Sequence, residues 1–254
     1  RFEKGSCLKV LDICLGLGYN SASLIEKTKE KEINLTWWGL EIDKRPLEIA
    51  LSTPGFSSNW SSIVKDRLRL LKKIGGWNDK TSQGRILIGD ARKKIDLIPE
   101  SLRFDLIYLD AFSPLHCPEL WSEEFLKTLS QRLCLGGRLI TYCRAAAVRS
   151  SLRRAGLQLS SLISKPKTQN QWSDGTIAIL QVEDESEALQ RVECFPLSQR
   201  EEEHLKTRAA IPYRDPRLNR SAEEIINTRT SEQKKSSMEK TSNWQKRWKK
   251  TEAA

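Results

Sequence analysis

The sequence predicts an α/β protein with a doubly wound sheet, mostly parallel, that ends in an antiparallel pair of strands. Three observations support this: short runs of almost purely apolar residues, segments of helical composition between them, and glycines or acids directly after the runs. Strands buried on both faces of a parallel sheet read as continuous apolar runs. A chain of 254 residues can form one such domain with an extension.

The first elements form a βαβ unit. A strand over residues 9–14 leads through the turn Gly16-Leu17-Gly18 into a helix over residues 20–30, and a second strand covers residues 35–42. Pro46 suits the first turn of the next helix, because its missing N–H has no partner there. A unit of this length implies parallel strands joined by a right-handed crossover.

The remaining elements continue the alternation. We expect a helix over residues 61–74, strands over 85–88, 104–110 and 138–143, a basic helix over 145–155, and a terminal antiparallel pair over 157–164 and 176–182. The strand over 85–88 is followed by Gly89 and Asp90, and the strand over 104–110 ends in Asp110.

Three regions follow from this pattern. Residues 1–183 form the sheet domain, residues 184–226 an extension packed on it, and residues 227–254 a tail with eight basic and three acidic residues. This composition predicts a largely disordered basic tail. The chain begins with Arg1 and reaches its first strand within about eight residues, so we expect an upstream segment to be missing.

Composition excludes several classes of protein. No window approaches the roughly 18 continuous apolar residues of a membrane span, and no signal peptide is visible, so we expect a cytoplasmic location and no membrane partner. The six cysteines lack CxxC spacing and are expected to be free thiols. With only two histidines, we expect no metal site.

Positive charge is concentrated in one stretch. The net charge is +10, and residues 131–170 hold eight Arg or Lys and no Asp or Glu. Such a field favours a polyanionic partner such as nucleic acid. The alternative is a solvated basic face.

The glycine turn is the first candidate ligand site. Gly16 and Gly18 let the backbone turn tightly and approach a ligand without a Cβ in the way. Ser21 stands where the GxGxxG fingerprint has its third glycine. This disfavours a pyrophosphate cofactor, and with it a nicotinamide dehydrogenase, and suits a cofactor with an amino-acid part. A plain tight turn is the alternative.

Three acids complete the candidate site, because ligands of open α/β sheets lie beyond the carboxyl ends of the strands. Glu41 can accept both hydroxyls of a ribose, with Asp43 as the substitute, or it can simply stabilise a helix N-terminus. Asp90, followed by Ala91, can accept the exocyclic N–H of an adenine or cap the next helix. Asp110 can orient an amine and accept its proton.

With these residues identified, the chain resembles the methyltransferase module of the MnmC-like family, the tRNA 5-aminomethyluridine methyltransferases, in the stand-alone form that lacks the flavin oxidase domain. The matching stretches are LDICLGLGYN (11–20), GLEID (39–43), IGDAR (88–92), DLIYLDAFSP with PELW (105–114 and 118–121), RAAAVRSSLRRAGL (144–157) and IPYRDP (211–216).

The resemblance implies a class I methyltransferase fold, Rossmann-like, and S-adenosylmethionine as cofactor. The implied reaction moves a methyl group to the aminomethyl nitrogen of a wobble-position 5-aminomethyluridine or its 2-thio form, giving 5-methylaminomethyluridine. The implied partners are the anticodon arm of tRNA and, transiently, the enzymes that install the aminomethyl group.

The resemblance also assigns roles to residues. The donor would be held by the turn and two acids, namely Gly16, Leu17, Gly18, Tyr19, Asn20, Glu41, Asp90 and Ala91. Asp110 would hold the amine. Phe112, Ser113 and Pro114 would contact the base, which an enzyme of this kind takes out of its stack, although Phe112 could equally pack in the core. Independently of the resemblance, the positive charge of the helix over residues 145–155 predicts that Arg149, Arg153 and Arg154 grip the anticodon arm.

Two other functions fit the same residues. A small-amine methyltransferase or a polyamine aminopropyltransferase also places an acid after the fourth strand, but the basic stretch disfavours a cationic substrate. A non-catalytic RNA-binding module on a methyltransferase fold is the second, and the intact set Glu41, Asp90 and Asp110 disfavours it.

Overall fold

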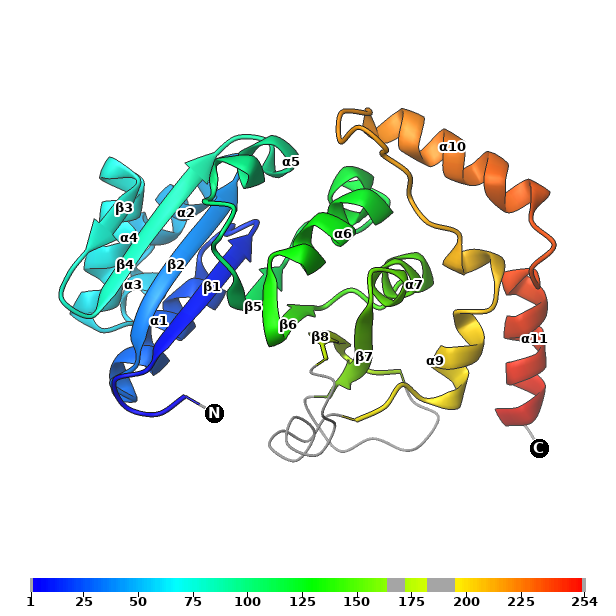
Figure 1. Cartoon of the computed structure of the whole chain (residues 1–254), viewed down its shortest axis with the longest axis horizontal. Coiled ribbons are helices and arrows are strands. Elements are labelled where there is room, and N and C mark those ends of the chain that lie inside the picture. The colour runs from blue at the N-terminus through cyan, green and yellow to red at the C-terminus, as the bar shows by residue number, and fades with distance from the viewer. Residues whose placement is uncertain (1, 164–171, 182–194, 253–254) are drawn as a thin grey trace. The chain divides into compact units, whose positions relative to one another are not determined.

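The computed structural model describes residues 2–163, 172–181 and 195–252 (Figure 1). The chain divides into two compact units, residues 1–110 and residues 111–254. The first unit holds the parallel strands and the second holds antiparallel strands, so the predicted fold class is confirmed.

The sheet of the first unit has the strand order β3-β4-β2-β1-β5. Strands β1 (Cys7–Ile13), β2 (Asn34–Glu41), β4 (Ser82–Ile88) and β5 (Phe104–Leu109) are parallel, and these four were predicted. Strand β3 (Gly76–Asn78) pairs antiparallel with β4 and was missed, because three residues carry too little pattern to be read as a strand.

Helices connect these strands. They are α1 (Tyr19–Glu30), α2 (Arg45–Ser52), α3 (Pro54–Ser57), α4 (Ser62–Ile74), α5 (Ala91–Lys94) and the 3₁₀ turn η1 (Ile95–Leu97). The apolar faces of α1 and α4 pack with β2 in one core, where the rings of Trp37 and Trp77 stack with centroids 5.6 Å apart. The predicted helices over 20–30 and 61–74 correspond to α1 and α4.

In the second unit, β8 (Gly175–Leu180) lies between β6 (Leu133–Thr141) and β7 (Leu157–Leu162) and is antiparallel to both. The predicted terminal antiparallel pair is therefore confirmed; its outer residues 164 and 182 lie outside the described residues. Within the residues that the structure describes, the helices of this unit are η2 (Pro118–Trp121), α6 (Glu123–Gln131), α7 (Ala146–Arg154), α9 (Gln199–His204), η3 (Arg208–Ala210), α10 (Ala222–Lys235) and α11 (Thr241–Glu252).

The prediction of a disordered tail from residue 227 is wrong for the residues described up to 252. A capping box formed by Ser221 and Glu224 begins α10. In α11, Trp244 and Trp248 are only 2 % and 6 % exposed, and the ring of Trp244 stacks on His204 of α9 with centroids 4.7 Å apart. Two tryptophans at i, i+4 spacing share one helix face, and burying that face outweighs the charge on the other.

The structure also bears on the predictions about membrane spans, cysteines and domain limits. Within the described residues, no helix is long and apolar enough to cross a membrane. The five described cysteines, Cys7, Cys14, Cys117, Cys134 and Cys143, are free thiols, and Cys194 lies outside the described residues. The domain boundary at residues 183 and 184 also lies outside them, so the domain limits stay a prediction.

Candidate functional site

The glycine turn lies where β1 ends and α1 begins. Its backbone is left-handed at three positions, Cys14 (φ 68°), Gly16 (φ 56°) and Gly18 (φ 87°). A Cβ at Gly18 would also lie 3.3 Å from Cδ1 of Leu47, so the left-handed backbone favours glycine there and any side chain would make a tight contact. The side chains of Leu17 and Tyr19 beside the turn are half exposed. The turn therefore presents open backbone at the carboxyl edge of the sheet.

Glu41 ties the end of β2 to this turn. Its Oε2 accepts a hydrogen bond from the backbone N–H of Gly16 at 2.8 Å, and its Oε1 accepts from the backbone N–H groups of Ile42 and Asp43 at 2.7 and 3.1 Å. The residue is only 7 % exposed. Asp43, the predicted substitute, instead accepts from the side chain of Arg45. Of the two acids, Glu41 is the one that faces the turn.

Ile42, which the sequence analysis did not select, is a candidate for the same site. It follows Glu41 directly and is 72 % exposed, although it is large and apolar. An exposed apolar side chain beside a buried carboxylate is suited to the flat face of a base whose sugar that carboxylate binds. The signal in the sequence is the apolar residue after the acid that ends a strand.

Asp110 stands at the end of β5, next to the same turn. Its backbone N–H donates to the carbonyl of Ile13 at 3.1 Å, and its Oδ2 accepts from Nδ2 of Asn20 at 2.9 Å. Both Asp110 and Asn20 are exposed. The predicted residues Gly16, Asn20, Glu41 and Asp110 are thus brought together around one strand end.

Asp12 is a second residue that the sequence analysis missed. It is 1 % exposed, and Ser21 donates to its Oδ2 at 2.5 Å, while among the described residues its buried Oδ1 has no hydrogen-bond partner. Burial raises its pKa to about 7; the hydrogen bond from Ser21 opposes this, and the charges of Asp110 and Glu41 add to it. The sequence feature that could have identified Asp12 is its position as an acid inside an apolar strand. A cationic ligand would relieve this concentration of carboxyl groups.

Asp90 adopts the capping role that the sequence left open. Its Oδ1 accepts from the backbone N–H of Arg92 at 3.0 Å, which caps α5, and its Oδ2 pairs with the Arg92 guanidinium at 2.8 Å. Burial acts to raise the pKa of Asp90, but the hydrogen bonds and charge of Arg92 outweigh it and lower the pKa. Ala91 is buried at 6 % exposure. The predicted adenine contact of this pair stays a prediction.

The predicted base-contacting residues belong to the second unit. Phe112 is 81 % exposed, so it is not a core residue, and its carbonyl accepts from Nε1 of Trp121 at 2.7 Å. The hydroxyl of Ser113 lies 2.8 Å from Nδ1 of His116. Pro114 is buried. Their contact with substrate stays a prediction.

Arg149 is not a phosphate contact, contrary to the prediction. It is fully buried, and its Nη1 pairs with Oε1 of Glu201 at 2.9 Å, while its other hydrogen bonds are accepted by the hydroxyls of Ser173 and Thr176 and the carbonyl of Gly175. Burial acts to raise the pKa of Glu201, but the hydrogen bond from Ser173 and the charge of Arg149 lower it to about 2. The pair holds α7 to α9, and its two residues are 52 positions apart in the chain.

Arg153 and Arg154 also have acidic partners. Arg153 binds Glu202 at 2.7 Å, and Arg154 binds Glu123. Their side chains are still 46 % and 45 % exposed, so a role at an RNA surface stays a prediction. The basic residues 165 and 167 of the same stretch lie outside the described residues.

Similar proteins were found both by sequence and by fold. A family model described as S-adenosyl-L-methionine-dependent methyltransferase matches residues 56–174, which include Asp90 and Asp110. A protein of Methanocaldococcus jannaschii is 29 % identical over 230 residues, covering 89 % of this chain and 60 % of its own length. The chain therefore spans less than two thirds of that relative.

Two named proteins are also similar. The bifunctional protein MnmC of Delftia acidovorans, described as acting in tRNA 5-methylaminomethyl-2-thiouridine biosynthesis, is 38 % identical over 88 residues, which are 33 % of this chain and 13 % of that protein. The crystal structure of MnmC2 from Aquifex aeolicus matches with a TM-score of 0.72 and 24 % identity, covering 91 % of this chain and 69 % of that one. Residues 56–174 therefore match a family of S-adenosyl-L-methionine-dependent methyltransferases, and the chain is similar to MnmC in part of its sequence and to MnmC2 in its fold.

Proposed function

We propose that the protein transfers a methyl group from S-adenosylmethionine to the aminomethyl nitrogen of 5-aminomethyluridine, or its 2-thio form, at the wobble position of tRNA. The product is 5-methylaminomethyluridine. The observation that carries the proposal is Asp110, an exposed carboxylate held by Asn20 beside the glycine turn. The pathway named for the Delftia relative supports the choice of substrate.

The residues at the strand ends fit the donor. Gly16 and Gly18 offer backbone without side chains, and Glu41, which accepts three backbone N–H bonds, retains about one acceptor site for a ribose hydroxyl. Ile42 offers an exposed apolar face to a purine. The buried Asp12 carboxyl supplies negative charge close to where a cation would lie. When bound, the donor supplies a methyl group on a positively charged sulfur.

Asp110 then acts on the amine. An alkylamine is mostly protonated near neutral pH and must lose its proton before it attacks, so the lone pair has to be freed and aimed. Asn20 holds Oδ2 of Asp110, which leaves Oδ1 to accept an N–H of the substrate. A carboxylate beside an amine also favours the charged form, so the larger contribution of Asp110 is orientation, which is worth about 7–11 kcal/mol in favourable cases.

The test is methyl incorporation from labelled donor into tRNA that carries 5-aminomethyluridine. Asp110→Ala should bind the donor as the wild type does but lose turnover by at least about 10²-fold. Asp96→Ala, which removes an exposed carboxylate on η1, is the matched control and should keep full activity. Undiminished turnover in Asp110→Ala would remove this residue from the mechanism.

The methylation assay and donor calorimetry together distinguish this function from the two alternatives. A small-amine methyltransferase or aminopropyltransferase would modify free amines such as putrescine and leave tRNA unchanged. An RNA-binding module without activity would give no heat of donor binding by calorimetry. Three earlier expectations stay predictions. They are the contact of Arg153 and Arg154 with the anticodon arm, contact with the enzymes that install the aminomethyl group, and a cytoplasmic location.

A further inference from the structure

One face of the first unit's sheet is open over β4, β2 and β1. Parallel strands of a doubly wound sheet are normally apolar on both faces. Here burial alternates along β2 and β4, so that Leu35 and Trp37 are buried while Thr36, Trp38, Gln83 and Arg85 reach solvent. The cause is the short connection from β4 to β5, in which α5 has four residues and η1 three. One helical turn cannot cover the full length of the strands.

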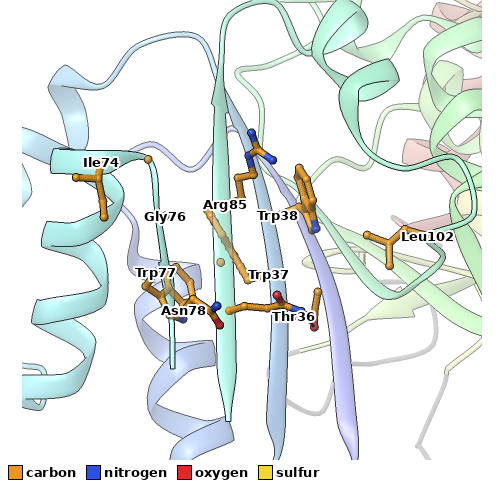
Figure 2. A pocket seen from close by; sticks show the side chains of 12 residues that line it. Thr36, Trp37, Trp38, Ile74, Gly76, Trp77, Asn78, Arg85 and Leu102 are labelled. Carbon is orange, nitrogen blue, oxygen red and sulfur yellow. Dashed lines mark hydrogen bonds between the residues drawn. The ribbon is translucent and has the colours of Figure 1, made fainter. Parts of the chain in front are cut away.

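This face contains a hollow of about 600 Å³ (Figure 2). Strand register places its side chains in two rows. Trp38 of β2 is paired with Arg85 of β4, and Thr36 is paired with Gln83. The Arg85 guanidinium carbon lies 5.7 Å from the Trp38 ring centroid, and Nε2 of Gln83 donates to Oγ1 of Thr36 at 3.2 Å. Leu102 and Asn78 line the rim.

The charge over the hollow is positive. Arg85 is exposed, and Lys9 of β1 is exposed in the row of Thr36. Within the described parts of the chain, no carboxylate forms an ion pair with either residue. Asp105 is the acid next to Lys9, and its Oδ2 accepts from the Lys9 backbone N–H at 2.9 Å. Arg85 is therefore the cation available to a ligand that enters beside Trp38.

We propose that this hollow binds one unpaired nucleotide of a single-stranded RNA: the Arg85 guanidinium, which lies over the Trp38 ring in this structure, moves to the phosphate, and the base stacks on the ring. Sequence-tolerant binding of single strands uses an aromatic ring for stacking and a cation for the phosphate, and both lie on this open sheet face. Side-chain amides can add hydrogen bonds to the base edges. Gln83 and Asn78 supply the amides. None of Gly16, Glu41 and Asp110 lines the hollow, so it is separate from the methyl-donor site.

The inference rests on the proposed function in one respect: the RNA is taken to be the tRNA substrate. The hollow would hold an unpaired nucleotide other than the one that is methylated. It gives the donor-binding unit its own contact with RNA, independent of the arginines of α7. Their phosphate contacts were predicted from charge alone, and the structure instead pairs Arg149, Arg153 and Arg154 with acids.

The experiment measures the anisotropy of a fluorescent oligouridylate over a range of salt concentrations. Trp38→Leu should weaken binding about 5- to 150-fold, the range expected when one stacked base is lost, and Trp38→Phe should restore most of it. Arg85→Gln should weaken binding and make the dependence of log K on log salt shallower by about 0.7, as for one phosphate of a single strand. Lys31→Gln, an exposed cation after α1, is the charge control and should match the wild type.

Donor calorimetry on each variant confirms that it is folded, since the donor site does not include these residues. Cross-linking of 4-thiouridine-labelled RNA should label the peptide that contains Trp38. If Trp38→Leu binds the oligonucleotide as the wild type does, or changes only the oligomeric state in sedimentation, the inference is overturned. If the wild type binds RNA through Trp38 but methylates no tRNA, the proposed function is wrong, whereas the assignment of RNA binding to the hollow is retained.

Discussion

Asp12→Asn should make the protein more stable at neutral and alkaline pH. The buried Asp12 carboxyl has its pKa raised from 3.8 to about 7, with burial as the main cause. In the unfolded chain the same group ionises near its ordinary pKa. Between about pH 4 and 7 folding therefore requires proton uptake, so the free energy of unfolding falls as pH rises through this window and is constant above it.

The size of the effect follows from the shift. About three pKa units correspond to about 4 kcal/mol of stability that the wild type lacks above pH 7. Asparagine keeps the shape of the side chain and can still accept the hydrogen bond from Ser21, but it carries no charge. The variant should therefore gain up to about 4 kcal/mol at pH 8 and nothing below pH 4.

Urea denaturation at a series of pH values measures this difference. The exposed carboxylate of Asp96 provides the control, because Asp96→Asn should leave the pH profile of the wild type unchanged. Parallel profiles for Asp12→Asn and the wild type across pH 4–8 would refute the reasoning that Asp12 is held partly protonated by its surroundings.

Three further results are expected. Donor binding should release a proton near pH 6–7 as Asp12 ionises beside the cationic sulfur, which calorimetry in buffers of different ionisation enthalpy detects; no release, or equal release in Asp12→Asn, would contradict this. Glu201→Gln should cost about 3–5 kcal/mol in urea denaturation, because it leaves Arg149 charged and buried, and a cost below about 1 kcal/mol would show that the pair is dispensable. Trp244→Ala should cost about 3–5 kcal/mol, whereas an unfolded tail would show no change.

The sequence was sufficient to predict the parallel strands and the residues at their ends. Apolar runs that stop at Glu41 and Asp110 mark both the strand and its carboxyl end, and neighbouring parallel strands bring such ends together. Gly16 and Gly18 were also predictable, because a left-handed backbone strongly favours glycine.

The errors came from partners that are distant in the chain. A count over residues 131–170 shows only positive charge, yet Arg149 and Arg153 pair with Glu201 and Glu202 on α9. A count over the last residues likewise predicts disorder, yet Trp244 is buried against His204. Linear composition cannot show which distant carboxylate or ring a side chain meets. Asp12 was missed for a related reason, since only the fold reveals that it is buried near Glu41 and Asp110.

Nucleoside analysis of tRNA from cells that lack this protein tests the central claim most directly. If the strand-end site methylates the aminomethyl nitrogen, 5-aminomethyluridine or its 2-thio form should accumulate and 5-methylaminomethyluridine should disappear. The wild-type chain should restore the methylated nucleoside and Asp110→Ala should not. Unchanged 5-methylaminomethyluridine in the deletion strain, with no accumulated precursor, would contradict the account.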